Sequence, residues 1–202
     1  SLPGAVLMLS RHGKIEIFES LGVQDPEVKT PMTKESIFRI YSMTKPVVSV
    51  AVMMLMEQGK LLLSDPVSKY LPEYAKQQVA VEAGGQVSYV PAKLATVQDL
   101  LRHTAGLTYE FLGNSAAQKA YRTTKIGMTL LDVNNAEFSK ILAAQPLQYD
   151  PATMWEYSRA TDVVGVLIEA ISGQTLGNYL EEHIFKPLKM METGFNVPVD
   201  KY

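Results

Sequence analysis

The chain has 202 residues, 47% of them hydrophobic, which is enough for one domain with a buried core. Its 19 lysines and arginines nearly balance 21 aspartates and glutamates, and this balance argues against a nucleic-acid or anionic-membrane partner. The lack of cysteine excludes disulfides, thiolate catalysis and cysteine-ligated metals.

The N-terminal segment predicts an antiparallel hairpin. Residues 5–10 and 14–19 alternate or run apolar around His12-Gly13, where the glycine can take the positive φ of a tight turn. A two-stranded hairpin is marginal alone. Because no further strand pattern follows Phe195, we expect the C-terminal strands that would complete this sheet to be missing from the chain.

A long helix is predicted from about Met43 to Gln58, after a strand-like run over residues 37–41. Gly59 provides a stop signal, and Pro46 fits the first turn, where its missing N–H has no partner to lose. The apolar residues that recur at helical spacing are Val47, Val50, Ala51, Met54 and Leu55.

The middle of the chain predicts a short helix, a second hairpin and a capped helix. A turn at residues 63–66 leads into a short helix ending near residue 71, and residues 79–82 and 87–90 flank a Gly-Gly turn. Thr96 is a candidate N-cap for a helix that ends at Arg102.

Three further helices are predicted towards the C-terminus. Asn135 can cap a helix over 136–144, a strongly apolar helix covers about 161–171 before Gly173, and Thr175 can cap another helix to about residue 185.

No repeat or linker divides the chain, so we treat residues 1–202 as a single, incomplete domain. It comprises an N-terminal hairpin over 1–35 and a mainly helical region over 36–190. The longest apolar stretch, residues 46–56, is too short to span a bilayer, so we expect a soluble chain without a membrane partner. The first residues lack a secretory signal pattern, which favours a cytoplasmic location, and a signal removed before residue 1 would leave the same sequence.

Ser42 and Lys45 form a Ser-x-x-Lys motif at the start of the first long helix. This spacing sets a hydroxyl and an amine one helical turn apart on the same face. A lysine kept unprotonated by burial could take the serine proton, and the alkoxide could then attack a carbonyl. A chain of this size contains about one such motif by chance. The simpler interpretation is a serine N-cap followed by a surface lysine.

Tyr157 is a second candidate for proton transfer. It stands just before the helix over 161–171, and an adjacent ammonium could lower the pKa of its phenol. Taken alone, such a residue is more often an ordinary half-buried tyrosine than a catalytic one. A catalytic role for Tyr157 is favoured only if Ser42 is the nucleophile.

A Ser-His-Asp site involving His103 with Asp99 or Asp162 is less favoured, because no Gly-x-Ser-x-Gly motif is present and His103 fits the end of a helix. His12 and His183 do not form a metal-binding pattern. The sequence also lacks nucleotide-binding motifs, so we expect no cofactor and no metal.

Three motifs together resemble one family. They are residues 38–46 (FRIYSMTKP), residues 100–107 (LLRHTAGL) and Tyr157-Ser158 with residues 162–165 (DVVG). The chain resembles the serine β-lactamase-related family, near class C β-lactamases and D-alanyl-D-alanine carboxypeptidases, and most of all the family VIII carboxylesterases. The resemblance covers residues 5–195. It implies an α+β, β-lactamase/transpeptidase-like fold with a helical region packed on an antiparallel sheet.

The resemblance implies roles for five residues. Ser42 would be the acylated nucleophile, Lys45 its base and Tyr157 the phenol that relays protons. A loop carrying Tyr109 and Phe111 would line the acyl pocket. The backbone N–H of Ser42, at a helix N-terminus, would be one oxyanion donor.

The chain departs from the family pattern in two places. Class C β-lactamases have asparagine two residues after the tyrosine, and Arg159 stands there instead, which favours ester over β-lactam hydrolysis. The Lys-Thr-Gly-like third motif is missing, and with it a second oxyanion donor.

We therefore expect a serine hydrolase that cleaves carboxylic esters through an acyl-enzyme on Ser42. A penicillin-recognising peptidase or weak β-lactamase is an alternative, and so is a noncatalytic fragment or interaction module of the same fold. The expected partners are a small-molecule ester or β-lactam substrate and a complementing C-terminal segment.

Overall fold

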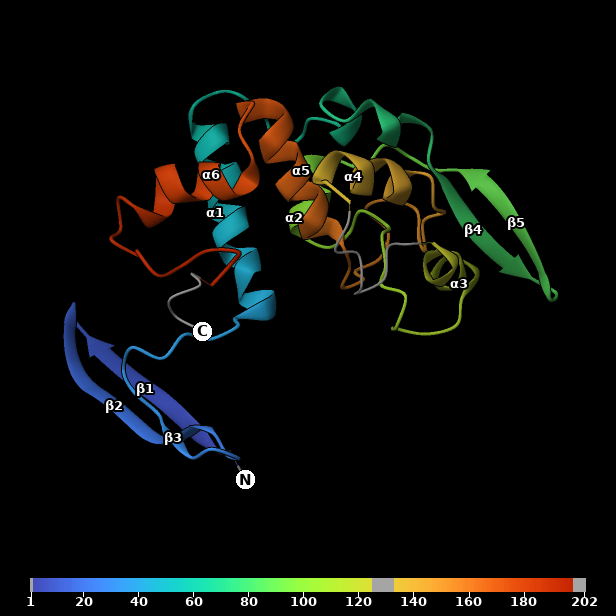
Figure 1. Cartoon of the computed structure of the whole chain (residues 1–202). Helices are drawn as coiled ribbons and strands as arrows, with labels where there is room; N and C mark the ends of the chain where they lie inside the picture. The colour runs from blue at the N-terminus through green and yellow to red at the C-terminus, as the bar shows by residue number, and fades with distance from the viewer. Residues whose placement is uncertain (1, 125–132, 198–202) are drawn as a thin grey trace. The chain divides into compact units, whose positions relative to one another are not determined.

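Figure 1 shows the chain as a computed structural model that describes residues 2–124 and 133–197. Two compact units are present, Ser1–Tyr41 and Ser42–Tyr202. The first unit is a small antiparallel sheet, and the second contains the helices and a separate hairpin.

The sheet of the first unit has the strand order β1 (Gly4–Arg11), β2 (Lys14–Asp25) and β3 (Thr30–Pro31), with antiparallel neighbours. His12 and Gly13 form the two-residue turn between β1 and β2, with φ of 50° and 74°. Positive φ at both turn positions matches the right-handed twist of the strands. The predicted hairpin is confirmed, and β2 continues six residues beyond the predicted end.

The strand-like run over residues 37–41 does not form a strand. Residues 36–40 have no regular secondary structure, and Tyr41 begins the 3₁₀ helix η1 (Tyr41–Met43) with φ of 45°. β-Branched and aromatic residues favour a strand only where a neighbouring strand accepts their backbone hydrogen bonds. In residues 2–41 the strand pairings involve only β1, β2 and β3.

Helix α1 (Thr44–Glu57) confirms the predicted long helix, and Gly59 follows it with φ of 70°. Its buried residues, spaced three or four apart, are Val48, Ala51, Val52 and Leu55. Val50, which the sequence pattern assigned to the buried face, is instead 53% exposed. The apolar run wraps around the helix, so periodicity alone could not fix which stripe faces the core.

Helix α5 (Ala160–Ser172) lies at the centre of the second unit. It contacts α1, α2 (Val97–Leu101), α4 (Asn135–Ala143) and α6 (Leu176–Leu180), and Figure 1 shows these helices around it. Its buried residues are Ala160, Val163, Val164, Gly165, Val166, Leu167 and Ile168. Gly173 ends it in the left-handed conformation at φ 73°, as the sequence predicted.

Side-chain caps fix where several helices begin. The hydroxyl of Thr96 accepts from the backbone N–H of Asp99, whose carboxylate accepts from Thr96 in return. Asn134 caps α4 rather than the predicted Asn135, because Glu137 then stands at the third helical position and completes the same reciprocal pair.

The predicted helix capped by Thr175 is confirmed as α6, which continues into the π-helical turn η4 (Glu181–Phe185). Helix α3 (Ala116–Thr123) was not predicted, although Ser115 and Gln118 form a capping box at its start.

The remaining elements join α1 to α2. Two 3₁₀ turns, η2 (Val67–Lys69) and η3 (Pro72–Lys76), precede the antiparallel strands β4 (Gln78–Ala83) and β5 (Gln86–Pro91), which confirm the second predicted hairpin. Across residues 2–124 and 133–197, no helix combines the length and apolar character that crossing a bilayer requires.

Candidate active site

Three predicted site residues meet at the N-terminal end of α1. Ser42 lies in η1, Lys45 lies in the first turn of α1, and Tyr157 precedes α5. Lys45 Nζ donates to Ser42 Oγ at 3.3 Å, and Tyr157 Oη donates to the same oxygen at 2.6 Å. The fold thus brings the Tyr157 phenol, 115 residues further along the chain, within hydrogen-bond distance of the Ser42 hydroxyl.

The burial that the sequence suggested for the lysine amine is not found. Lys45 is half-buried and Ser42 is exposed. The buried stripe of α1 begins at Val48, so the first turn of the helix stays at the surface of the second unit. A helix that is apolar overall does not bury its first turn unless other elements cover that turn.

The Tyr157 phenol has a pKa below that of an ordinary tyrosine. Interaction with the Lys45 side chain lowers the pKa of Tyr157, and the hydrogen bond with Ser42 lowers it further. Lys45 Nζ also lies 4.6 Å from the centre of the Tyr157 ring. The lowered pKa makes this phenol a better proton donor and acceptor near neutral pH than an ordinary tyrosine.

Of the two residues predicted to line an acyl pocket, Tyr109 lies beside the phenol and Phe111 lies against Tyr109. Tyr109 and Phe111 stack with ring centroids 4.9 Å apart, and the Tyr109 ring is 5.5 Å from the Tyr157 ring. Burial raises the pKa of Tyr109, so its hydroxyl stays protonated. Phe111 is exposed and joins the site through Tyr109.

His103 packs against the site but does not contact Ser42. Its ring lies 5.0 Å from that of Tyr157, and its Nδ1 accepts from the backbone N–H of Ser158 at 3.3 Å. Burial lowers the pKa of His103, as does the nearby charge of Lys45, so the ring stays neutral at neutral pH. The less favoured Ser-His-Asp arrangement has no support in this geometry.

Asp99, one of the carboxylates considered for that arrangement, instead forms hydrogen bonds that hold the local structure. It accepts hydrogen bonds from Thr96, Arg102 and Thr104, which tie the end of α2 to the loop after it. The other carboxylate, Asp162, lies in the first turn of α5 and is exposed.

Sequence reasoning missed the residues that hold the Tyr157 segment. The Glu156 carboxylate accepts from Thr108 Oγ1 at 2.7 Å, and Gln118 Nε2 donates to the same carboxylate oxygen at 3.5 Å. Arg159 forms an ion pair with Glu110. These partners are 38 to 49 residues apart in the sequence, so no local pattern could reveal them.

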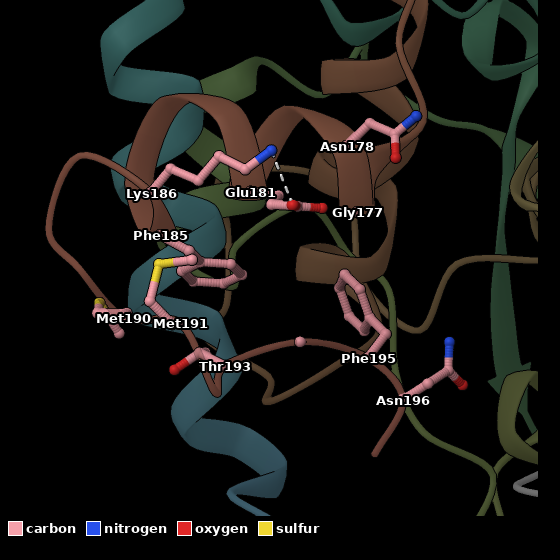
Figure 2. A pocket seen from close by; sticks show the side chains of 11 residues that line it. Gly177, Asn178, Glu181, Phe185, Lys186, Met190, Met191, Thr193, Phe195 and Asn196 are labelled. Carbon is pink, nitrogen blue, oxygen red and sulfur yellow. Dashed lines mark ion pairs between the residues drawn. The ribbon is translucent and has the colours of Figure 1, made fainter. Parts of the chain in front are cut away.

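A separate hollow of about 400 Å³ lies between α6, η4 and residues 190–196 (Figure 2). Glu181 and Lys186 form an exposed ion pair at its edge, with 2.9 Å between Oε1 and Nζ, and Phe195 lines it further along. None of the predicted site residues lines this hollow. In the part of the chain that the structure describes, no three His, Asp or Glu side chains gather in a way that could hold a metal ion.

A sequence model of the family described as Beta-lactamase matches residues 1–201, and the chain belongs to this family. The β-lactamase/transpeptidase-like fold predicted from the motifs is confirmed by this match and by the solved structures that the chain resembles.

Two curated relatives illustrate the match. Protein Rv1367c of Mycobacterium tuberculosis is 36% identical over 201 residues, which are 98% of this chain and 49% of that protein. Esterase EstB of Burkholderia gladioli is 34% identical over 194 residues, which are 96% of this chain and 47% of that protein. The chain therefore spans about half the length of the curated relatives that it matches.

Two solved structures show the same correspondence. EstCE1, described as a hydrolase with promiscuous acyltransferase activity, superposes with a TM-score of 0.77 at 32% identity. The match covers 93% of this chain and 47% of the EstCE1 chain. Simvastatin synthase LovD from Aspergillus terreus has a TM-score of 0.74 at 26% identity, with coverage of 93% and 47%.

Proposed function

We propose that the protein containing this chain is a serine hydrolase that cleaves carboxylic esters through an acyl-enzyme formed on Ser42. The observation that supports this most directly is the double contact of Ser42 Oγ, at 2.6 Å from Tyr157 Oη and 3.3 Å from Lys45 Nζ. A nucleophile with two proton-transfer groups in reach is what acyl transfer requires.

In the acylation step, the neutral amine form of Lys45 accepts the Ser42 proton while Oγ forms a bond to the ester carbonyl carbon. The carbonyl oxygen takes up the negative charge, and the backbone N–H of Ser42 is one donor for it, because Ser42 stands at the positive end of α1. When the carbon–oxygen bond of the ester breaks, Tyr157 delivers the proton to the departing alcohol and recovers one from Lys45.

Deacylation reverses these roles. Tyr157, whose pKa is lowered by Lys45 and Ser42, first passes its proton to Lys45, and the phenolate then takes a proton from water as the water oxygen attacks the acyl carbon. The bond between the acyl carbon and Ser42 Oγ breaks, Lys45 returns its proton to Oγ, and the carboxylic acid leaves.

Two facts favour an ester over a β-lactam as substrate. The relative EstB is named an esterase and EstCE1 a hydrolase with acyltransferase activity. The residue two positions after Tyr157 is Arg159, which is bound to Glu110 instead of presenting a free amide to a substrate.

Labelling with a fluorophosphonate, followed by intact-mass measurement and peptide mapping of the complete protein, tests the proposal. We expect one adduct, on Ser42, which Ser42→Ala abolishes and the exposed-strand variant Ser10→Ala retains. Lys45→Ala and Tyr157→Phe should each slow hydrolysis of a nitrophenyl ester by about 10²–10⁴-fold.

The alternatives give different results in the same assays. Turnover of a cephalosporin that exceeds turnover of nitrophenyl acetate would favour a β-lactamase or peptidase. A folded protein with no adduct on Ser42 would contradict the proposal and favour a noncatalytic role.

A further inference from the structure

Arg159 and Glu110 form an ion pair that lies almost entirely inside the second unit. Arg159 Nη2 lies 2.8 Å from Glu110 Oε1 and 3.0 Å from Oε2, and only 11% and 12% of the two side chains are exposed. The planar guanidinium accepts few orientations opposite a carboxylate. The contact therefore fixes the position of both side chains.

The same guanidinium also faces Tyr109. Its Cζ lies 5.1 Å from the centre of the Tyr109 ring, within the range of a cation–π interaction. Glu110 is the next residue in the chain after Tyr109. Arg159 thus holds Tyr109 in two ways, through the neighbouring carboxylate and through the aromatic ring itself.

Tyr109 connects Arg159 to the candidate catalytic residues Tyr157 and Ser42. It stacks on Phe111 at 4.9 Å and lies 5.5 Å from the Tyr157 ring, which contacts Ser42. We call Tyr109 and Phe111 the aromatic wall.

A second arginine secures the far side of the loop that carries the aromatic wall. Arg122 Nη1 donates to the carbonyl oxygens of Glu110 at 2.6 Å and Gly113 at 2.7 Å, and Nη2 donates to Asn114 Oδ1 at 3.0 Å. Arg122 contacts only oxygens of the loop, whereas Arg159 contacts the wall itself. This difference assigns the position of the ring to Arg159.

We propose that the Arg159–Glu110 ion pair is a positioning device that sets the aromatic wall and so selects esters with flat, aromatic acyl groups over acetyl esters. This inference rests on the proposed esterase function. A buried ion pair contributes little to stability compared with apolar residues of the same size. Its particular contribution here is a defined orientation of the aromatic wall, whose exposed Phe111 ring offers a face on which an aromatic acyl group can stack.

The test compares nitrophenyl benzoate with nitrophenyl acetate in the complete protein. Arg159→Lys keeps the positive charge but loses the planar guanidinium that can donate to both carboxylate oxygens. The double variant Glu110→Leu with Arg159→Met removes both charges and replaces them with apolar side chains of similar size. Glu181→Gln, in an exposed ion pair away from the site, is the matched control. We expect KM for the benzoate to rise about tenfold in both test variants, with KM and kcat for the acetate each changed by less than about threefold.

A spectroscopic measurement accompanies the kinetics. Trp155, the single tryptophan, stacks at 6.5 Å on Tyr157, whose ring lies 5.5 Å from that of Tyr109, so it is linked to the aromatic wall through Tyr157. Its near-ultraviolet circular dichroism band should weaken in Arg159→Lys and in the double variant, and stay unchanged in Glu181→Gln.

Each outcome decides the matter. Unchanged KM for the benzoate, or an equal rise for both esters, would overturn the positioning proposal. If the unmodified protein hydrolyses neither ester and Ser42 takes no fluorophosphonate, the esterase function fails. The tryptophan band then decides separately whether Arg159 orients the ring, because a band that is unchanged in both variants rejects that role.

Discussion

The two units differ in what determines their structure. None of the residues 2–41 is buried, although β1 and β2 carry many apolar side chains, and their hairpin depends on a turn with two positive φ values. The second unit is organised around α5, with buried residues along most of that helix. Turn geometry governs the first unit, whereas side-chain packing governs the second.

The largest expected effect sharpens this comparison with one substitution in each unit. Leu167→Ala removes a fully buried side chain of α5 and should lower the free energy of unfolding by about 2–5 kcal/mol. Leu9→Ala truncates a strand residue that is 52% exposed and should cost less than about 1 kcal/mol.

Urea unfolding followed by Trp155 emission measures the first change, and amide hydrogen exchange along β1 measures the second. An equal loss at both positions would mean that the exposed face of the hairpin is covered in the complete protein, and the contrast between the units would not hold.

An intermediate effect is expected for glycines with positive φ. Gly106 has φ of 80°, and a methyl group there would collide with the carbonyl oxygen of Tyr149. Gly13 has φ of 74°, with nothing within 4 Å of an added Cβ. Gly106→Ala should therefore cost about 2–3 kcal/mol, and Gly13→Ala only about 1 kcal/mol from backbone strain. Thermal unfolding of the two variants gives the comparison, and a larger loss at Gly13 would reverse it.

The smallest expected effect concerns pH. Hydrogen bonds lower the pKa of Asp65 from 3.8 to about 2. The largest contribution comes from Tyr70, followed by Leu62 N–H and Lys69. Because the folded pKa is the lower one, the stabilisation is present above pH 3.8 and is lost as the pH falls through about 2.

Asp65→Asn should lower Tm at pH 7 by a few degrees and flatten the dependence of Tm on pH in that acidic window. Asp25→Asn, in the first unit, is the matched control, because its Oδ1 accepts only local backbone N–H groups and an amide oxygen can replace it. The same flattening with Asp25→Asn would show that Asp65 is not its source.

The elements that the sequence predicted well carry their signals locally. The His12-Gly13 turn, the helix that becomes α1 and the left-handed Gly173 each follow from neighbouring residues. The missed helix α3 is short and its apolar residues are alanines and one tyrosine, yet its start was readable from Ser115 and Gln118 as a capping box.

What the sequence could not predict depends on distant partners. The run over 37–41 has strand-like residues but no partner strand, and the burial of Lys45 depended on what covers the first turn of α1. The candidate site followed from motifs at Ser42 and Tyr157. The contacts of Arg159 and His103 join positions 49 and 55 residues apart, which only tertiary packing brings together.

The anchoring of the residues around Tyr157 has a further consequence. Glu156 is bound through its carboxylate and through its backbone N–H, which donates to the His103 carbonyl at 2.9 Å, and the buried Ser158 is bound to the same histidine. The phenol between them thus has little torsional freedom left to lose when a substrate arrives. Under the proposed function, the entropic cost of aligning a proton donor would thus be met during folding rather than in each turnover.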